Sequence, residues 1–138
     1  MSIAVEEVDA AATHDLRRRV LRSHQPGLPA TNPEDDLPET FHLAAVEGDT
    51  ILGVASFTRA GTRVRLRGMA VEPAAQGRGV GRFMMEAALE RLRGEGAEVL
   101  WAHARDTAIG FYERFGMTVV GDGLDEIDIP HHLMVLEL

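Results

Sequence analysis

Apolar and polar residues alternate along residues 41–71, and apolar residues then recur at helical spacing along residues 79–93. The first segment predicts three strands in an antiparallel meander, because the turn sequences EGDT and RAGT separate its apolar runs. In the second segment, apolar residues three and four positions apart define one helical face. They are Val80, Met84, Met85, Ala88, Leu89 and Leu92. A glycine at position 94 or 96 is expected to end this helix.

Shorter patterns predict the remaining elements. The expected strands are 3–8, 97–103, 117–120 and 131–138, and the expected helices are 9–22, with Asp9 as N-cap, and 106–116. Residues 23–40 hold four of the six prolines and predict a loop with at most one helical turn. The order β-α-loop-β-β-β-α-β-α-β-β indicates an α+β or mixed α/β fold, and a single domain is expected over residues 1–138.

Composition and charge argue against several kinds of protein. A net charge of −8 disfavours general binding to nucleic acid or to an anionic membrane, so an anion would need a local site. The chain has no cysteine, which excludes disulfides, thiolate catalysis and cysteine-ligated metals. Its first 20 residues carry acidic side chains and no long apolar run, so we expect neither a signal peptide nor a membrane anchor, and a cytoplasmic location.

Residues 72–83, EPAAQGRGVGRF, place three glycines and two arginines between an expected strand and an expected helix. Glycines let a backbone approach phosphate oxygens, and the N–H groups of a first helical turn attract an anion. Arg78 and Arg82 would each oppose the helix dipole by about 0.3–1 kcal/mol unless a bound phosphate paired with them. The spacing is that of neither a Walker loop nor a Rossmann fingerprint. The alternative is that the glycines only shape a turn and the arginines are solvated.

Two motifs together resemble a known family. QGRGVG (76–81) resembles the Q/R-x-x-G-x-G/A motif of the GNAT superfamily, the Gcn5-related N-acetyltransferases. ARDTAIGFYERFGM (104–117) is similar to that family's fourth helix, and LRGMAVEP (66–73) to its fourth strand. The resemblance covers nearly all of the chain after residue 40. It implies a mixed, mostly antiparallel central sheet of six to seven strands, flanked by about four helices.

The resemblance also implies residue roles in binding acetyl-CoA as cosubstrate. Backbone groups of Met69, Ala70 and Val71 would contact the pantetheine arm. The pyrophosphate would be held by the motif residues Gln76, Gly77, Arg78, Gly79, Gly81 and Arg82. Arg105 stands where the family helix usually opens with asparagine, so it is a cofactor-binding candidate whose contact departs from the family pattern.

Tyr112 matches the family tyrosine that protonates the departing thiolate, and it is also a cofactor-binding candidate. A phenol with an ordinary pKa of about 10 can donate to the sulfur as it becomes basic in the transition state. Helical spacing places Ala108, Phe111 and Phe115 on one face, which we expect to contact the core. Tyr112 lies about 100° from Phe111 and is not obviously part of that face.

The acceptor side carries charges of both signs. Arg63, Arg65 and Arg67 alternate along the fourth strand and project to one face, either as surface or ion-paired residues or as the lining of a pocket for a carboxylate or phosphate. Arg65 and Arg67 are the substrate-binding candidates, and Arg65 stands where some members have a glutamate base. The acidic segments 34–39 and 122–128 would attract a cationic amine.

The base that deprotonates the amine is open among five residues. The candidates are Glu126, His131, His132, His42 and His103, with His131 and Glu126 as the leading catalytic candidates. The histidines lack the spacing of a metal site, so no metal is expected.

The resemblance and the residues together predict an N-acyltransferase that moves acetyl from acetyl-CoA to a primary amine by direct attack in a ternary complex. The acceptor would be a small-molecule or protein amine, with no nucleic acid or membrane partner and a possible homodimer. One alternative is a non-catalytic acyl-CoA-binding or sensory module of the same fold. The other is a protein that binds a nucleotide or phosphate at the same helix end.

Overall fold

The computed structural model describes residues 2–22, 30–126 and 129–138, without the side chains of residues 124–126. Seven strands form one sheet in the order β1-β2-β3-β4-β5-β7-β6. The strands are β1 (Ala4–Val8), β2 (Thr40–Glu47), β3 (Thr50–Ala60), β4 (Arg63–Val71), β5 (Val99–Arg105), β6 (Thr118–Glu126) and β7 (Ile129–Glu137). All neighbouring pairs are antiparallel except β4 and β5, so the sheet is the mixed, mostly antiparallel one expected.

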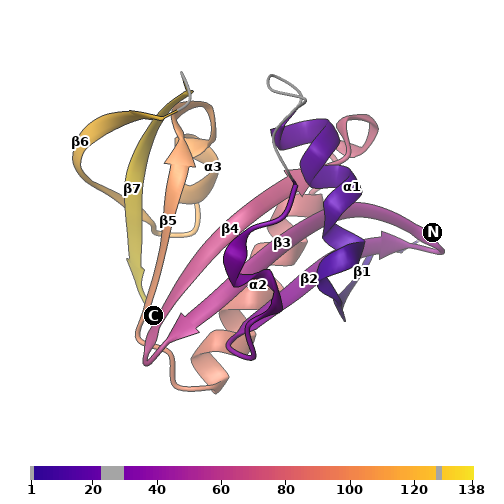
Figure 1. Ribbon diagram of the computed structural model, residues 1–138, viewed down its shortest axis with the longest axis horizontal. Coiled ribbons are helices and arrows are strands. Elements are labelled where there is room, and N and C mark those ends of the chain that lie inside the picture. Colours follow the sequence, from indigo (N-terminus) through magenta and orange to yellow (C-terminus); the bar gives the residue numbers. More distant parts are fainter. Residues whose placement is uncertain (1, 23–29, 127–128) are drawn as a thin grey trace.

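Helices cover both faces of this sheet (Figure 1). The longest is α2 (Val80–Gly94), on the face opposite α1 (His14–Leu16). A 3-10 turn, η1 (Ala10–Thr13), and a π-helical turn, η2 (Arg17–Leu21), extend α1 at its two ends. The 3-10 turn η5 (Asp106–Ala108) leads into α3 (Ile109–Glu113), and single 3-10 turns η3 (Pro33–Asp36) and η4 (Pro73–Ala75) lie in the connections. Three α-helices in the described residues replace the four or so expected.

Local sequence explains where these elements begin and turn. The carboxylate of Asp9 accepts a hydrogen bond from the backbone N–H of Ala12 at 3.1 Å, which confirms the N-cap expected for the first helix. The two turns of the meander contain Gly48 and Gly61 at φ of 61° and 64°, a left-handed conformation that favours glycine. The meander and the helix after it therefore form where their patterns predicted.

Alternation along the strands divides the core into two layers. Phe41 and Leu43 of β2 pack on the α2 side with Met84 and Leu92, whereas Ala44 packs on the α1 side. The larger cluster, under α2, is almost entirely aliphatic and aromatic. No helix in the described residues is long and apolar enough to span a membrane.

Candidate active site

The strands β4 and β5 diverge at the centre of the sheet. They pair in parallel only from Arg63 to Arg65, opposite Val99 to Trp101, and separate beyond that point (Figure 1). The second half of β4 therefore has a β3 neighbour on one side and no β5 partner on the other. Backbone N–H and C=O groups on this unpaired side can bind an extended ligand, as an added strand would.

A β-bulge at Gly68 and Met69 changes which side chains β4 presents. Val54 pairs with Ala70 and Ser56 with Arg67, so two β4 residues stand opposite the single residue between them on β3. Gly68 has φ +62°, in the left-handed region. Because side chains alternate along a strand, the extra residue reverses the faces that follow: Leu66 and Met69 both pack on the α2 side, and Ala70 on the α1 side.

A cleft of about 870 Å³ lies between the end of β4, the start of α2 and α3. Its lining includes all the predicted cofactor residues except Arg105, from three separate segments of the chain. They are Met69, Ala70, Val71, Gln76, Gly77, Arg78, Gly79, Gly81, Arg82 and Tyr112. The structure thus gathers in one hollow the residues that the two motifs singled out.

The start of α2 presents backbone donors to this cleft. Gly79 is its N-cap at φ +80°, and its first turn has neither a side-chain cap nor an acidic residue. The first N–H groups of a helix have no partner within the helix, so they are available to an anion. Arg78 is ion-paired with Glu47, and the Arg82 Nε lies 3.4 Å from a Glu86 carboxylate oxygen. These exposed ion pairs give both arginines a carboxylate partner in the absence of an anion.

Gly81 brings α2 close to α3. A Cβ at Gly81 would lie 3.0 and 3.1 Å from two ring carbons of Phe111, tighter than ordinary van der Waals contact. Gly77, by contrast, has open space around its missing Cβ and needs glycine only for its φ of 86°. Gly77 and Gly79 are therefore explained by their positive φ, whereas Gly81 is explained by its packing against an aromatic ring.

Tyr112 is buried, with 6% of its surface exposed, and lines both this cleft and a second cavity. Ala108, Phe111 and Phe115 pack against the core, as expected, but they are only partly buried, and Tyr112 is the buried residue of α3. Burial raises the pKa of Tyr112 to about 12, so the phenol stays protonated at neutral pH.

The second cavity, of about 240 Å³, lies where β4 and β5 diverge. Arg22, Arg67 and Arg105 line it, and Met69, Ala108 and Tyr112 form its boundary with the cleft. Arg105, a cofactor candidate from the sequence, thus faces the second cavity instead of the cleft.

The two substrate-binding candidates on β4 lie in different surroundings. An Arg67 nitrogen lies 2.7 Å from Glu34 Oε2, so Arg67 is both ion-paired and part of the second cavity. Arg65 stacks its guanidinium 4.8 Å from the centre of the Trp101 ring, and neither the cleft nor the second cavity includes it in its lining. The structure therefore brings Arg67, and not Arg65, to the second cavity.

The candidate bases are spread over different environments. His132 contacts Asp106 at 2.6 Å, and His42 is buried on the α1 side of the sheet. His131 is also buried and outside both cavities; its Nδ1 donates to the carbonyl of Ile129, and its ring contacts that of His103. Of the four histidine candidates, His103 lines the second cavity. The side chain of Glu126 lies outside the described residues, among which no cluster of metal-ligating side chains is found.

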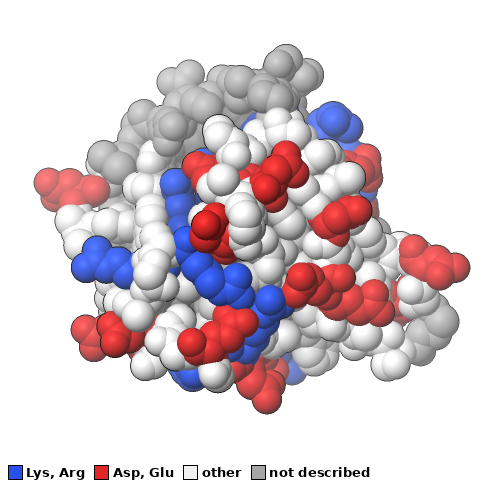
Figure 2. All heavy atoms as spheres, turned by 60° about the horizontal axis from the view of Figure 1, so that its bottom comes forward, with Lys and Arg blue, Asp and Glu red and all other residues white. Residues whose placement is uncertain are grey.

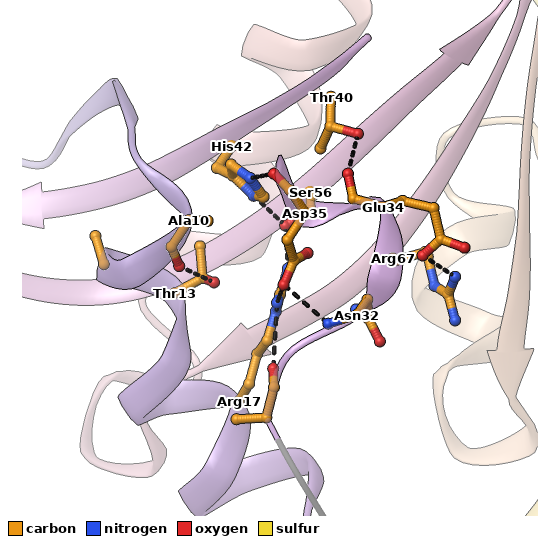
Figure 3. Close-up of polar contacts among 12 residues, drawn as sticks. Ala10, Thr13, Arg17, Asn32, Glu34, Asp35, Thr40, His42, Ser56 and Arg67 are labelled. Carbon is orange, nitrogen blue, oxygen red and sulfur yellow. Dashed lines mark hydrogen bonds and ion pairs between the residues drawn. The ribbon is translucent and has the colours of Figure 1, made fainter. Parts of the chain in front are cut away.

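A buried polar network that no sequence pattern predicts supports β4 (Figure 3). Arg17, 1% exposed, donates to a carboxylate oxygen of Asp35 at 2.7 Å and also to Ser56. His42 contacts Ser56 Oγ at 2.6 Å and the Asp35 carbonyl at 3.0 Å. Since that carbonyl only accepts, His42 Nε2 carries a proton, and Ser56 can donate to a neutral ring at Nδ1.

The network fixes the turn η3 and with it Glu34, the partner of Arg67 (Figure 3). Thr40 Oγ1 donates to the Glu34 carbonyl at 2.7 Å, and the Asn32 N–H donates to the Asp35 carboxylate at 2.9 Å. A single acidic stretch in the sequence thus has two roles: Asp35 is buried and structural, and Glu34 pairs with Arg67, which lines the second cavity.

The mixed seven-stranded sheet and the glycine-rich start of α2 are those that the resemblance to GNAT acetyltransferases implies. The sequence model of the Acetyltransferase (GNAT) family matches residues 10–117. The chain therefore belongs to the GNAT family and is a GNAT-type N-acetyltransferase.

Individual relatives agree with this assignment. The uncharacterized N-acetyltransferase YitI of Bacillus subtilis is 26% identical over 140 residues, covering 96% of this chain and 94% of that protein. The N-alpha-acetyltransferase RimI of Mycobacterium tuberculosis is 28% identical over 123 residues, covering 86% of this chain and 78% of that protein. The PaiA N-acetyltransferase of Thermoplasma acidophilum, solved in complex with coenzyme A, shares the fold with a TM-score of 0.78, at 11% identity over the whole of both chains.

Proposed function

We propose that the protein transfers an acetyl group from acetyl-CoA to a primary amine, by direct attack of the amine within a ternary complex. The observation that carries this proposal is that the cleft and the second cavity meet at Met69, Ala108 and Tyr112. A donor in one hollow and an acceptor in the other would react at that boundary. The coenzyme A bound by the PaiA structure supports the same cosubstrate.

The residues of the cleft fit the chemistry of acetyl-CoA. The uncapped start of α2, with Arg78 and Arg82 beside it, would hold the pyrophosphate, and the unpaired edge of β4 would hold the pantetheine amides. Both arginines would exchange an exposed carboxylate partner for a phosphate that also accepts from the helix N–H groups.

In the reaction, a C–N bond forms to the thioester carbonyl carbon and the C–S bond breaks. The amine loses one proton and the sulfur gains one. A backbone N–H of β4, at Val71 or a neighbour, would stabilise the oxyanion, an effect worth about 3 kcal/mol per donor in other acyl-transfer sites.

Tyr112 would supply the proton to the sulfur. Its burial keeps the phenol protonated, with a pKa of about 12, and the same low-polarity surroundings would destabilise a thiolate. A sulfur that leaves beside Tyr112 would therefore gain most from a hydrogen bond, which the Tyr112 hydroxyl can donate.

Tyr112→Phe tests this role, because it removes the hydroxyl and keeps the buried ring. Coenzyme A release should be measured with acetyl-CoA and a panel of amines, alongside the dissociation constant of acetyl-CoA. We expect kcat to fall about 10²-fold with little change in acetyl-CoA affinity. A protein that binds acetyl-CoA, turns over no amine and is unaffected by Tyr112→Phe would be the sensory module instead.

Replacing both phosphate-side arginines tests the assignment of the cleft. We expect Arg78→Ala with Arg82→Ala to weaken acetyl-CoA about tenfold, since each exposed charge contributes up to about 1 kcal/mol. Arg93→Ala, at the exposed far end of α2, is the matched control and should leave affinity unchanged. If ADP bound as tightly as acetyl-CoA, the pantetheine arm would add nothing and the nucleotide-binding alternative would be favoured.

A further inference from the structure

The second cavity has an unusual charge for this protein. The chain carries a net charge of −8, yet among the described residues three arginines and no acidic residue line the cavity. On the surface, arginine and acidic side chains are interleaved (Figure 2), and exposed arginines such as Arg19 and Arg59 are ion-paired with glutamates. The described wall of the cavity therefore presents several arginine side chains, of which Arg67 has the carboxylate of Glu34 as its partner.

Arg105 is the arginine that stands out. Its side chain is partly buried, and one of its nitrogens donates to the carbonyl of Leu21 at 2.7 Å. Among the described residues no carboxylate lies within 4.0 Å of its guanidinium. Burial first and the positive charge of Arg22 second lower the pKa of Arg105, so its surroundings do not compensate its charge.

The position of Arg105 relates it to the reacting groups. It ends β5 and lines the same cavity as Tyr112, while the hydrogen bond to Leu21 ties it to the end of η2. Its remaining N–H donors form a planar fork that suits a carboxylate. The third arginine, Arg67, already has the carboxylate of Glu34 as its partner.

We propose that the amine acceptor is a small zwitterion, an amine that carries a carboxylate, and that Arg105 binds this carboxylate within the second cavity. The inference rests on the proposed acetyl transfer and specifies its acceptor. A cavity of about 240 Å³ has room for a molecule of amino-acid size, given that a water occupies about 30 Å³.

The same charges would favour the reactive form of the acceptor. An amine attacks only when it is neutral, and an ordinary alkyl ammonium has lost few protons at neutral pH. Within the described lining no acidic side chain stabilises the ammonium, while the guanidinium of Arg105 disfavours it. The wall would thus hold the acceptor by its carboxylate and lower the pKa of its amine.

The test compares α- and ω-amino acids with their carboxamide counterparts as acceptors of acetyl from acetyl-CoA. We expect kcat/KM to be at least tenfold higher for the carboxylate member of the best pair, because the amide lacks the charge that Arg105 would bind. Equal kcat/KM values for both members, or preference for the amide, would overturn the proposal while leaving acetyl transfer established. If acetyl-CoA bound but no amine were acetylated, the proposed function itself would fail.

Variants of Arg105 test whether this residue causes the preference for a carboxylate acceptor. Arg105→Met should raise KM for the carboxylate acceptor about tenfold or more, leave KM for the amide unchanged and keep the dissociation constant of acetyl-CoA. Arg105→Lys, which keeps the charge, should restore part of the preference, and Arg63→Met, at an exposed position outside both cavities, is the matched control. An Arg105→Met enzyme with the full carboxylate preference of the parent would refute the role of Arg105, and the comparison of acceptors by the parent enzyme needs no variant to fold.

Discussion

Tyr112 can be titrated on its own in this protein, because the chain has one tyrosine and neither lysine nor cysteine. Burial raises its pKa to about 12, whereas an exposed tyrosine titrates near about 10. We expect the near-ultraviolet absorbance of tyrosinate to appear in the native protein with a midpoint near pH 12. In denaturant the same signal should have its midpoint about two pH units lower.

The difference in pKa between native and unfolded protein has a predictable effect on stability. Between about pH 10 and pH 12 the unfolded chain loses the phenolic proton and the native chain keeps it, so the unfolded state binds fewer protons. The free energy of unfolding therefore falls as pH rises through this interval. Two pKa units at 1.36 kcal/mol each give a loss of about 2.7 kcal/mol once the pH is above both pKa values.

Urea unfolding at a series of pH values from about 9 to 11.5, on the parent and on Tyr112→Phe, measures this loss. The free energy of unfolding of the parent should decline by about 1.36 kcal/mol per pH unit above pH 10, and Tyr112→Phe should lack this component. A native titration midpoint near pH 10, or an equal decline in Tyr112→Phe, would refute the reasoning. Either result would mean that water reaches the phenol, and Tyr112 would then not be a buried proton donor.

Two further predictions concern β4 and the start of α2. Gly68→Ala should lower the free energy of unfolding by about 1–3 kcal/mol more than Gly48→Ala: both have positive φ, but a Cβ at Gly68 would lie 2.7 Å from Arg17 Nε, whereas Gly48 has no atom within 4 Å. Equal losses in urea unfolding would contradict this close contact. Glu47→Gln should tighten acetyl-CoA about two- to fivefold at low salt by releasing Arg78 from its ion pair, a gain that calorimetry should find reduced at high salt. Unchanged affinity at low salt would argue against Arg78 as a phosphate ligand.

The elements with a strong period could be predicted from the sequence. The meander and α2 lie where the alternation of residues 41–71 and the helical spacing of residues 79–93 placed them. Strand β6 is longer than the expected 117–120, since it continues to Glu126. Its second half contains Gly121 at φ +74° and a register shift between Val120 and Leu124, and an irregular strand of this kind leaves no alternating pattern in the sequence.

The site could be predicted in part, for a related reason. The cofactor candidates of the motif are close together in the sequence, so a local pattern identifies them, and the structure gathers them in one cleft. The second cavity depends on the divergence of β4 and β5, which brings Arg22 next to Arg105 across 83 positions of sequence. No local pattern distinguishes an arginine that lines such a cavity from a solvated one, so the sequence did not predict that Arg22 and Arg105 line the same cavity.

The bulge on β4 explains why Arg17 is buried. A buried ion pair is often no more stabilising than apolar residues of the same volume, so the pair with Asp35 is a costly way to fill a core. Here the guanidinium lies against Gly68, in the space that a Cβ would need. The bulge at Gly68 in turn reverses the faces on which the following side chains of β4 lie. Arg67 therefore faces η3, while Met69 lies at the boundary of both cavities. The polar network thus supports the bulge that lets a single strand line the second cavity with its middle residues and the cleft with its last ones.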